Sequence, residues 1–150
     1  MKAKKRILYP TDFSPAAAPA FEYALEAAKR DEAILILAHV IEPTSPFADD
    51  VYMALPGAGL EAAEASARRQ FDGLLARAKA EDVDARDVLR CGQPAEEIAS
   101  LAESEFADLI VMGTHGRRGL RRLMLGSVAQ QVVATAPCPV VTVRMTDPLP

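Results

Sequence analysis

The chain has 150 residues, half of them apolar, and a formal net charge of -4. A chain of this length buries about 70% of the surface that its unfolded form exposes, so we expect one domain with a substantial core over residues 1–150. The acidic balance argues against general affinity for nucleic acid or anionic lipid, because both attract a basic excess.

The sequence lacks the usual signals for a membrane or secreted location. No apolar run approaches the roughly 18 to 20 residues of a membrane span, and the first ten residues lack the apolar stretch of about 7 to 15 residues that a signal peptide needs. We therefore expect a cytoplasmic protein without a membrane partner. His39, Cys91 and Cys138 have no further ligand at a metal-binding spacing, so we expect a packed histidine and two reduced cysteines.

The first strand and the first helix can be read from the N-terminal segment. Lys5–Tyr9 is predicted to be a strand that Pro10 ends, because the proline ring removes a donor from the ladder. Ser14 is expected to cap a helix with Pro15 at its first position, where a missing amide costs nothing. Pro19 is expected to leave the first turn of this helix irregular.

The middle of the chain alternates strands and helices. Ala33–Val40 is almost wholly apolar and is predicted to be a central strand. Residues 41–59 are rich in proline and glycine, which predicts a long connection. A long helix over Leu60–Ala80, a strand over Asp84–Leu89 and a helix beginning at Gln93 are expected to follow.

A glycine-rich stretch follows the fourth predicted strand, Leu109–Met112. Two residues separate Gly113 from Gly116, and nine separate Gly116 from Gly126, which Ser127 follows directly. Glycine lets backbone amides approach phosphate oxygens without a Cβ in the way, and a helix beginning at Ser127 adds unpaired amides and the positive end of its dipole. We interpret the stretch as a phosphate cradle. The alternative is that the glycines serve only turns and a helix start.

The side chains around the predicted cradle leave several interpretations open. Four arginines lie between residues 117 and 122. Three interpretations are open: the arginines form a solvated basic turn, they contact RNA, or Arg117 or Arg118 neutralises phosphates. We prefer the last interpretation. His115 either donates to a phosphate or fills the loop. In the helix after Ser127, Val128, Val132 and Val133 are expected to share one face.

The last predicted strand is Val140–Arg144. Strands and helices then alternate along the whole chain, which indicates a single doubly wound α/β domain with helices on both faces of a parallel sheet. The lysine of a P-loop is missing between Gly126 and Ser127, and the spacing from Gly113 to Gly116 does not fit a dinucleotide turn. No arrangement typical of a catalytic nucleophile or a zinc site is visible.

The spacing of Gly113, Gly116, Gly126 and Ser127 resembles the nucleotide signature of the ATP-binding branch of the universal stress protein family. The stretches Ile7–Ser14 and Pro137–Val141 resemble the same family. The resemblance implies a Rossmann-like fold, similar to the adenine nucleotide alpha hydrolases, with five parallel strands in the order 3-2-1-4-5.

The resemblance also implies a nucleotide site outside the carboxyl ends of the strands. Asp12 would face the cradle there and hold a ribose hydroxyl or Mg²⁺, whereas an Asx turn is its structural alternative. Carried over position by position, the resemblance implies ligand contacts from Pro10, Thr11, Asp12, Val40, Met112, Gly113, Gly116, Gly126, Ser127 and Val128.

The function implied is that of an ATP-binding regulatory or sensor module in the stress response, with ATP or another adenine nucleotide and Mg²⁺ as cofactors. A slow ATPase or self-phosphorylating enzyme is one alternative, and an interaction protein that has the fold but leaves the site unused is another. We also expect a homodimer that pairs through Val140–Arg144, because this edge strand is apolar and the family commonly dimerises through its last strand. Val141→Pro is expected to dissociate it.

Overall fold

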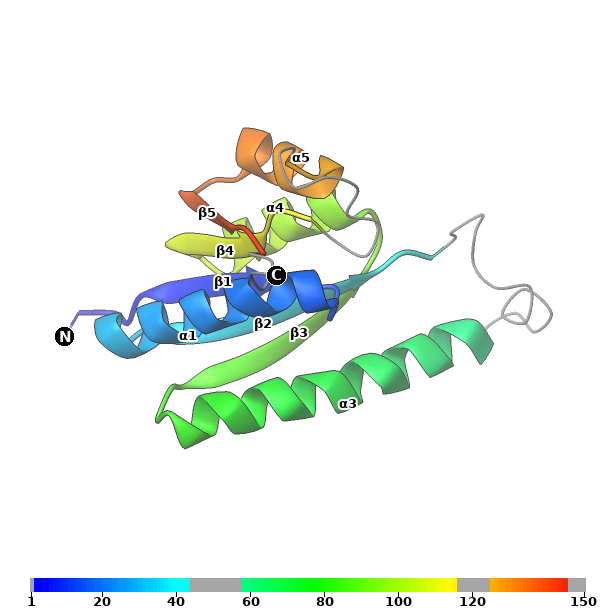
Figure 1. The fold of residues 1–150 in the computed structure, drawn as a ribbon. Coiled ribbons are helices and arrows are strands. Elements are labelled where there is room, and N and C mark those ends of the chain that lie inside the picture. Colours follow the sequence, from blue (N-terminus) through cyan, green and yellow to red (C-terminus); the bar gives the residue numbers. More distant parts are fainter. Residues whose placement is uncertain (1, 44–57, 116–124, 146–150) are drawn as a thin grey trace, which may run out of the picture.

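The computed structural model describes residues 2–43, 58–115 and 125–145. In this part of the chain five strands form one parallel sheet in the order β3-β2-β1-β4-β5 (Figure 1). The strands are β1 (Arg6–Pro10), β2 (Ile34–Ile41), β3 (Ala85–Cys91), β4 (Leu109–Gly113) and β5 (Val140–Val143). The doubly wound fold and its strand order, as expected from the sequence, are confirmed.

Helices cover both faces of the sheet. They are the short 3-10 helix η1 (Pro15–Ala17) and the α-helices α1 (Ala18–Asp31), α3 (Ala58–Ala80), α4 (Pro94–Ser104) and α5 (Ser127–Thr135). Figure 1 shows α1 and α3 on one side of the sheet and α4 and α5 on the other.

Alternate residues of the central strand β1 supply the two halves of the core. Ile7 and Tyr9 pack with α1 and α3, whereas Leu8 packs with α4 and α5. All three side chains are at most 2% exposed. Because successive side chains of a strand point to opposite faces, a strand covered on both faces must be apolar throughout. This is why the continuous apolar runs predicted the central strands correctly.

Pro10 is the last residue of β1, although the sequence predicted that it would end the strand one residue earlier. It lies opposite Ala38 of β2, and the ladder continues with the Thr11 amide donating to the Ala38 carbonyl at 2.8 Å. On the other side, pairing with β4 involves only Ile7 and Leu8. The missing amide of Pro10 therefore interrupts no described hydrogen bond.

The first helix begins irregularly, as Pro19 predicted. Residues Pro15–Ala17 form a 3-10 turn, and α1 begins only at Ala18. Ser14 precedes this turn with extended backbone angles, but its side chain makes no capping hydrogen bond. Ser14 therefore occupies the expected cap position with Pro15 directly after it, but its side chain does not cap the helix, because the Ala17 amide donates to the backbone carbonyl of Ser14 instead.

The valines of α5 do not lie on one face, contrary to the prediction. Ala129 and Val132 are buried, whereas Val133 is 51% exposed. Val133 lies five residues after Val128, which is about 140° around a helix of 3.6 residues per turn. The two valines therefore cannot share a narrow face.

The two edges of the sheet differ in character. The edge strand β3 carries exposed Arg86 and Arg90, with Asp87 half-buried between them, whereas the described residues of β5 are three valines and a threonine, all half-buried. Arg144, expected inside the last strand, lies just beyond it. Among the residues that the structure describes, no helix is long and apolar enough to cross a membrane.

Candidate functional site

The predicted site residues gather where the winding of the sheet reverses. From β1 the chain proceeds to β2 and β3 on one side, and then returns to β4 and β5 on the other. In sheets of this kind a crevice opens outside the carboxyl ends of the strands at the reversal point. Pro10 ends β1 in this region, Thr11 and Asp12 follow it, and Met112 and Gly113 end β4.

The loop after β1 is fixed by its own side chains and by β2. The Phe13 amide donates to Thr11 Oγ1 at 2.9 Å, and the Ser14 amide donates to Asp12 Oδ1 at 2.9 Å. His39 Nδ1 lies 2.7 Å from the Thr11 carbonyl oxygen and donates to it, since a carbonyl can only accept. Asp12 thus makes the Asx turn that was its structural alternative, and one carboxylate oxygen is committed to the loop.

The end of β4 packs closely against two neighbouring segments. A Cβ at Gly113 would lie 3.1 Å from the Ala16 carbonyl oxygen in η1, and a Cβ at Gly126 would lie 2.8 Å from the Thr114 carbonyl oxygen. The Gly126 amide donates to that same Thr114 oxygen at 2.6 Å. A Cβ at Gly126 would force the backbone apart, whereas at Gly113 the neighbouring backbone would have to move by a few tenths of an ångström.

These contacts place the start of α5 beside the end of β4. The helix begins at exposed Ser127, and Val128 packs partly against the core on the α4 side. The first amides of a helix have no partner within it, so this end offers hydrogen-bond donors and a positive dipole to an anion. The described residues Gly113, Gly126 and Ser127 thus lie together at the ends of β4 and α5, and their role as a phosphate cradle stays a prediction.

The remaining predicted residues fall into two groups. Val40, near the end of β2, is half-buried, and His115, just after β4, is also half-buried. Gly116, Arg117 and Arg118 lie outside the described residues, so the structure provides no geometry for them.

Two polar atoms at this end of the sheet are buried without a hydrogen-bond partner in the described structure. They are Ser14 Oγ, in the loop after β1, and His115 Nε2, in the loop after β4. Buried polar groups are normally paired, so unpaired ones at the mouth of a crevice suit a ligand that supplies the missing partner. Sequence reasoning found His115 but missed Ser14, because a serine before a helix was interpreted as a cap.

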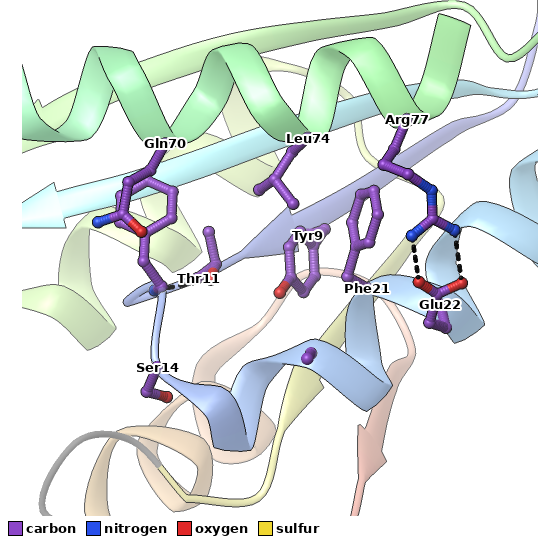
Figure 2. Close-up of a pocket in the computed structure, with 10 residues that line it drawn as sticks. Tyr9, Thr11, Ser14, Phe21, Glu22, Gln70, Leu74 and Arg77 are labelled. Carbon is purple, nitrogen blue, oxygen red and sulfur yellow. Dashed lines mark hydrogen bonds and ion pairs between the residues drawn. The ribbon is translucent and has the colours of Figure 1, made fainter. Parts of the chain in front are cut away.

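A groove lies beside the crevice, between α1 and α3, with a volume of about 240 Å³. Figure 2 shows the side chains of Tyr9, Phe21 and Leu74 along it, with Ser14 near one end and Arg77 near the other. Arg77 Nη1 lies 2.9 Å from Glu22 Oε1, so an ion pair joins the two helices there. Sequence reasoning did not identify this groove, because its walls come from segments far apart in the chain.

The site offers few ligands for a metal ion. In the described ranges no group of three or more histidine, cysteine or acidic side chains is placed to hold one. Asp12 is half-buried at the end of β1 and supplies one carboxylate. Mg²⁺ commonly binds through one or two carboxylates together with substrate phosphates, so Asp12 suits an ion that arrives with a nucleotide better than a resident ion.

Comparison with known sequences gives full-length similarity. Residues 4–144 match the Universal stress protein family. Universal stress protein MJ0577 of Methanocaldococcus jannaschii is 34% identical over 155 aligned residues, which cover 93% of this chain and 94% of that protein. A universal stress protein of Thermus aquaticus is 38% identical over 144 residues, covering 93% of this chain and 98% of the relative.

Comparison with solved structures also finds universal stress proteins. The structure of MJ0577 superposes with a TM-score of 0.78 and 29% identity, covering 96% of this chain and 98% of that one. A universal stress protein in complex with cAMP (TM-score 0.71, 24% identity, 95% and 98% coverage) and one from Archaeoglobus fulgidus in complex with dAMP (0.65, 19%, 95% and 98%) share the fold. On the sequence match, the strand order and the length covered, this chain belongs to the universal stress protein family.

Proposed function

We propose that this protein binds an adenine nucleotide, with ATP as the first candidate, outside the carboxyl ends of β1, β2 and β4. The observation that carries the proposal is the close backbone contact between Gly126 and Thr114, which holds the start of α5 against the end of β4. It sets helix amides and a dipole beside the loop that carries Asp12. Proteins of this fold solved with cAMP and with dAMP support the same ligand class.

The nucleotide would divide its contacts between the two sides of the crevice. The strand ends would contact the base and the ribose through Pro10, Thr11, Asp12, Val40 and Met112. The cradle would bind the phosphates through Gly113, His115, Gly116, Arg117, Arg118, Gly126, Ser127 and Val128. Mg²⁺ would reduce the charge of the phosphates, and Asp12 is the side chain that would hold it.

In this proposal the bound nucleotide serves as a signal. Family membership and the match to the cradle pattern favour a regulatory or sensor module of the stress response, acting in the cytoplasm.

The described residues offer Asp12 as the one acidic side chain in the predicted site, and its turn already uses one oxygen. Any ATP hydrolysis should therefore be far slower than the median enzyme turnover of about 10 per second. Multiple-turnover kinetics at that rate, abolished by Ser127→Ala, would favour an enzyme.

Titration calorimetry with ATP and Mg²⁺, and separately with NAD, tests the proposal. ATP should bind saturably and NAD should not. Ser127→Ala should weaken ATP binding by roughly 10- to 150-fold, since a hydrogen bond to a charged group contributes about 1.5 to 3 kcal/mol. Ser104→Ala is the matched control, because that hydroxyl bonds the Leu101 carbonyl in α4. Binding of NAD without ATP would overturn the assignment, and mass spectrometry of ligands released from the denatured protein would identify the nucleotide carried.

We also propose a homodimer formed through β5. The apolar edge of β5 lacks the charges that protect β3, and an unprotected edge strand tends to pair with another copy. Pairing of two β5 strands about a two-fold axis would satisfy the open backbone groups of both.

A further inference from the structure

Phe13 has an unusual backbone conformation for an aromatic residue. Its φ is 62°, in the left-handed region, and it lies between Asp12 and Ser14 in the loop after β1. A bulky side chain rarely adopts this conformation unless the surrounding structure imposes it. What holds Phe13 therefore also determines the shape of the loop.

Two elements hold the Phe13 ring. Its centroid lies 5.2 Å from that of Phe71 in α3, at an interplanar angle of 79°, and 4.7 Å from that of His39 in β2. The contact with Phe71 is edge-to-face, which is favourable for aromatic pairs at this distance, and the His39 ring is tilted by 38°. Phe71 is fully buried, and the His39 ring is fixed by its bond to the Thr11 carbonyl. Both partners are thus themselves held in place.

The backbone turn at Phe13 sets the orientation of Asp12. The left-handed residue directs the next amide, that of Ser14, back onto Asp12 Oδ1 at 2.9 Å. If the Phe13 backbone returned to an ordinary negative φ, the Ser14 amide would move away and the Asp12 carboxylate would lose this bond. The anchored ring therefore maintains the bond that orients Asp12.

The groove between α1 and α3 leaves open volume beside Phe13, so its contacts with Phe71 and His39 matter more. Phe13, Thr11 and Ser14 all line its open volume of about 240 Å³. A side chain beside open volume is less constrained by general packing than one enclosed in a core. Phe13 packs against the core only on the side of Phe71, so we expect its conformation to depend mainly on the ring contacts with Phe71 and His39.

We propose that Phe13 is a positioning residue for the nucleotide site: its ring, held by Phe71 and His39, keeps the loop in the shape that directs Asp12 at the ligand. This proposal rests on the proposed nucleotide binding. Phe13 acts through Asp12 and need not touch the ligand itself. It also links α3, which contributes none of the predicted ligand contacts, to the affinity of the site.

Four variants of the full chain test the proposal, through the hydrogen exchange of the Ser14 amide and the affinity for ATP. Phe13→Gly removes the ring but permits the left-handed backbone, and Phe71→Leu removes the aromatic partner while keeping an apolar core residue. Phe13→Tyr keeps the ring contacts and should therefore leave Ser14 exchange and ATP affinity as they are in the unmodified protein. Phe21→Leu is the matched control, because Phe21 is a buried aromatic of the same groove whose ring contacts are with Tyr9 and Arg77.

In the ligand-free protein, hydrogen exchange of the Ser14 amide should accelerate by about tenfold in Phe13→Gly and Phe71→Leu, because the hydrogen bond to Asp12 opens locally. ATP affinity, measured where all variants are folded, should fall by about tenfold in the same two variants, which is one 1.4 kcal/mol step in binding free energy. Phe13→Tyr and Phe21→Leu should retain the unmodified values of both, even if Phe21→Leu lowers the melting temperature.

The outcomes separate the two proposals. Faster Ser14 exchange in a protein that binds no ATP would reject the proposed function and leave the role of Phe13 in the loop intact. Unchanged exchange and unchanged affinity in Phe13→Gly would reject the positioning role while ATP binding stands. Equal loss of affinity in Phe21→Leu would also reject it, since the effect would then follow from stability alone.

Discussion

Tyr9 places a hydroxyl group on the buried face of β1, where it is 1% exposed. The hydroxyl donates to the Ala17 carbonyl oxygen at 2.8 Å. Burial is the main reason that the pKa of Tyr9 is raised from 10.0 to about 12, because the phenolate would lose its hydration. The hydroxyl thus stays neutral in the folded protein at pH values where the unfolded chain ionises.

This difference predicts a loss of stability at high pH. The folded pKa lies above the unfolded one, so the stabilisation is complete below pH 10 and is lost as the pH rises from 10 toward 12. A shift of two units corresponds to about 2 to 3 kcal/mol. Denaturant unfolding should show this fall, and Tyr9→Phe should remove most of it, whereas Tyr23→Phe, at a 43% exposed position, is the control. An equally steep fall in Tyr9→Phe would contradict the prediction.

Gly126 leads to a prediction about the cradle. Ala at this position would bring its Cβ within 2.8 Å of the Thr114 carbonyl oxygen, which is backbone and cannot rotate away. Gly126→Ala should lower the unfolding free energy by about 1 to 3 kcal/mol, as overpacking does, and should weaken ATP binding. Gly73→Ala is the matched control in α3, where a Cβ meets nothing within 4 Å. It should gain about 0.5 to 1 kcal/mol. Chemical denaturation and calorimetry would measure both effects, and a neutral Gly126→Ala would contradict the close contact.

At the residue scale the glycine pattern of the predicted cradle can be read from the sequence, but the contacts that hold the neighbouring loop after β1 cannot. The spacing of Gly113, Gly126 and Ser127 is a local property that can be read along the chain. The conformation of Phe13 depends on His39 and Phe71, which lie 26 and 58 residues further on, and no local pattern indicates such contacts. The Ser14 side chain makes no capping bond for a local reason, since the 3-10 turn pairs the Ala17 amide with the Ser14 carbonyl.

At the scale of elements, three helices end in the same way. Each has a non-glycine residue in the left-handed conformation just past its end: Glu32 after α1, Asp82 after α3 and Phe106 after α4. After α4 the Ala107 amide donates to the Ala102 carbonyl and the Phe106 amide to that of Glu103, which is a Schellman arrangement. Glycine is the usual residue there, so its absence deprived the sequence of a clear signal for these helix ends.

Phe106 is the least suited of the three to its position, because its ring is 78% exposed and has little contact to lose. Phe106→Gly should raise the unfolding free energy by about 0.5 to 1 kcal/mol. A non-glycine residue in the left-handed conformation costs about 1 to 2 kcal/mol, which glycine avoids. Part of this gain is lost, because glycine gives the unfolded chain more conformational entropy. The control is Glu103→Gly, an exposed position inside α4 that should lose a similar amount. Thermal unfolding that shows a loss for Phe106→Gly would mean that the exposed ring has a stabilising contact.

Element type was easier to predict than element ends. The alternation of apolar strands with amphipathic helices follows from burial on both faces of the sheet, and it predicted every described strand and α-helix. Strand ends moved by one or two residues, as in β3, which continues to Cys91 instead of ending at Leu89. These ends depend on pairing, since Ile41 of β2 lies opposite Cys91 and extends the ladder.

At the scale of the whole molecule, the strand order came from family resemblance and not from the pattern. Right-handed crossovers allow several orders for five parallel strands. The order decides which strands are edges, and therefore where two copies can join. In this sheet the edges are β3 and β5.

The proposed dimer leads to a prediction about single amides of β5. The Pro139 carbonyl accepts from Ile110 in β4, and the Val143 carbonyl accepts from Thr114 just after β4. By alternation the backbone groups of Val141 face β4 and those of Thr142 face the open edge. Thr142→Pro should therefore give a monomer by light scattering, and Asp87→Pro on the other edge should remain a dimer. Val141→Pro, the change suggested by the sequence, is the poorer test because it would also break the bond to β4. A mass of 16.1 kDa for the unmodified protein at micromolar concentration would contradict the dimer.

The charges on β3 have a consequence for how far assembly can proceed. In a dimer joined through β5, the two β3 strands become the outer borders of one continuous sheet. Arg86 is ion-paired with Glu105, and Asp87 with Arg68, at these borders. A third copy would have to break or bury these pairs to add a strand, which is costly for charged groups. In the proposed dimer, the same residues that leave β5 as the edge for pairing would thus limit the assembly to a finite pair and prevent growth into a fibre.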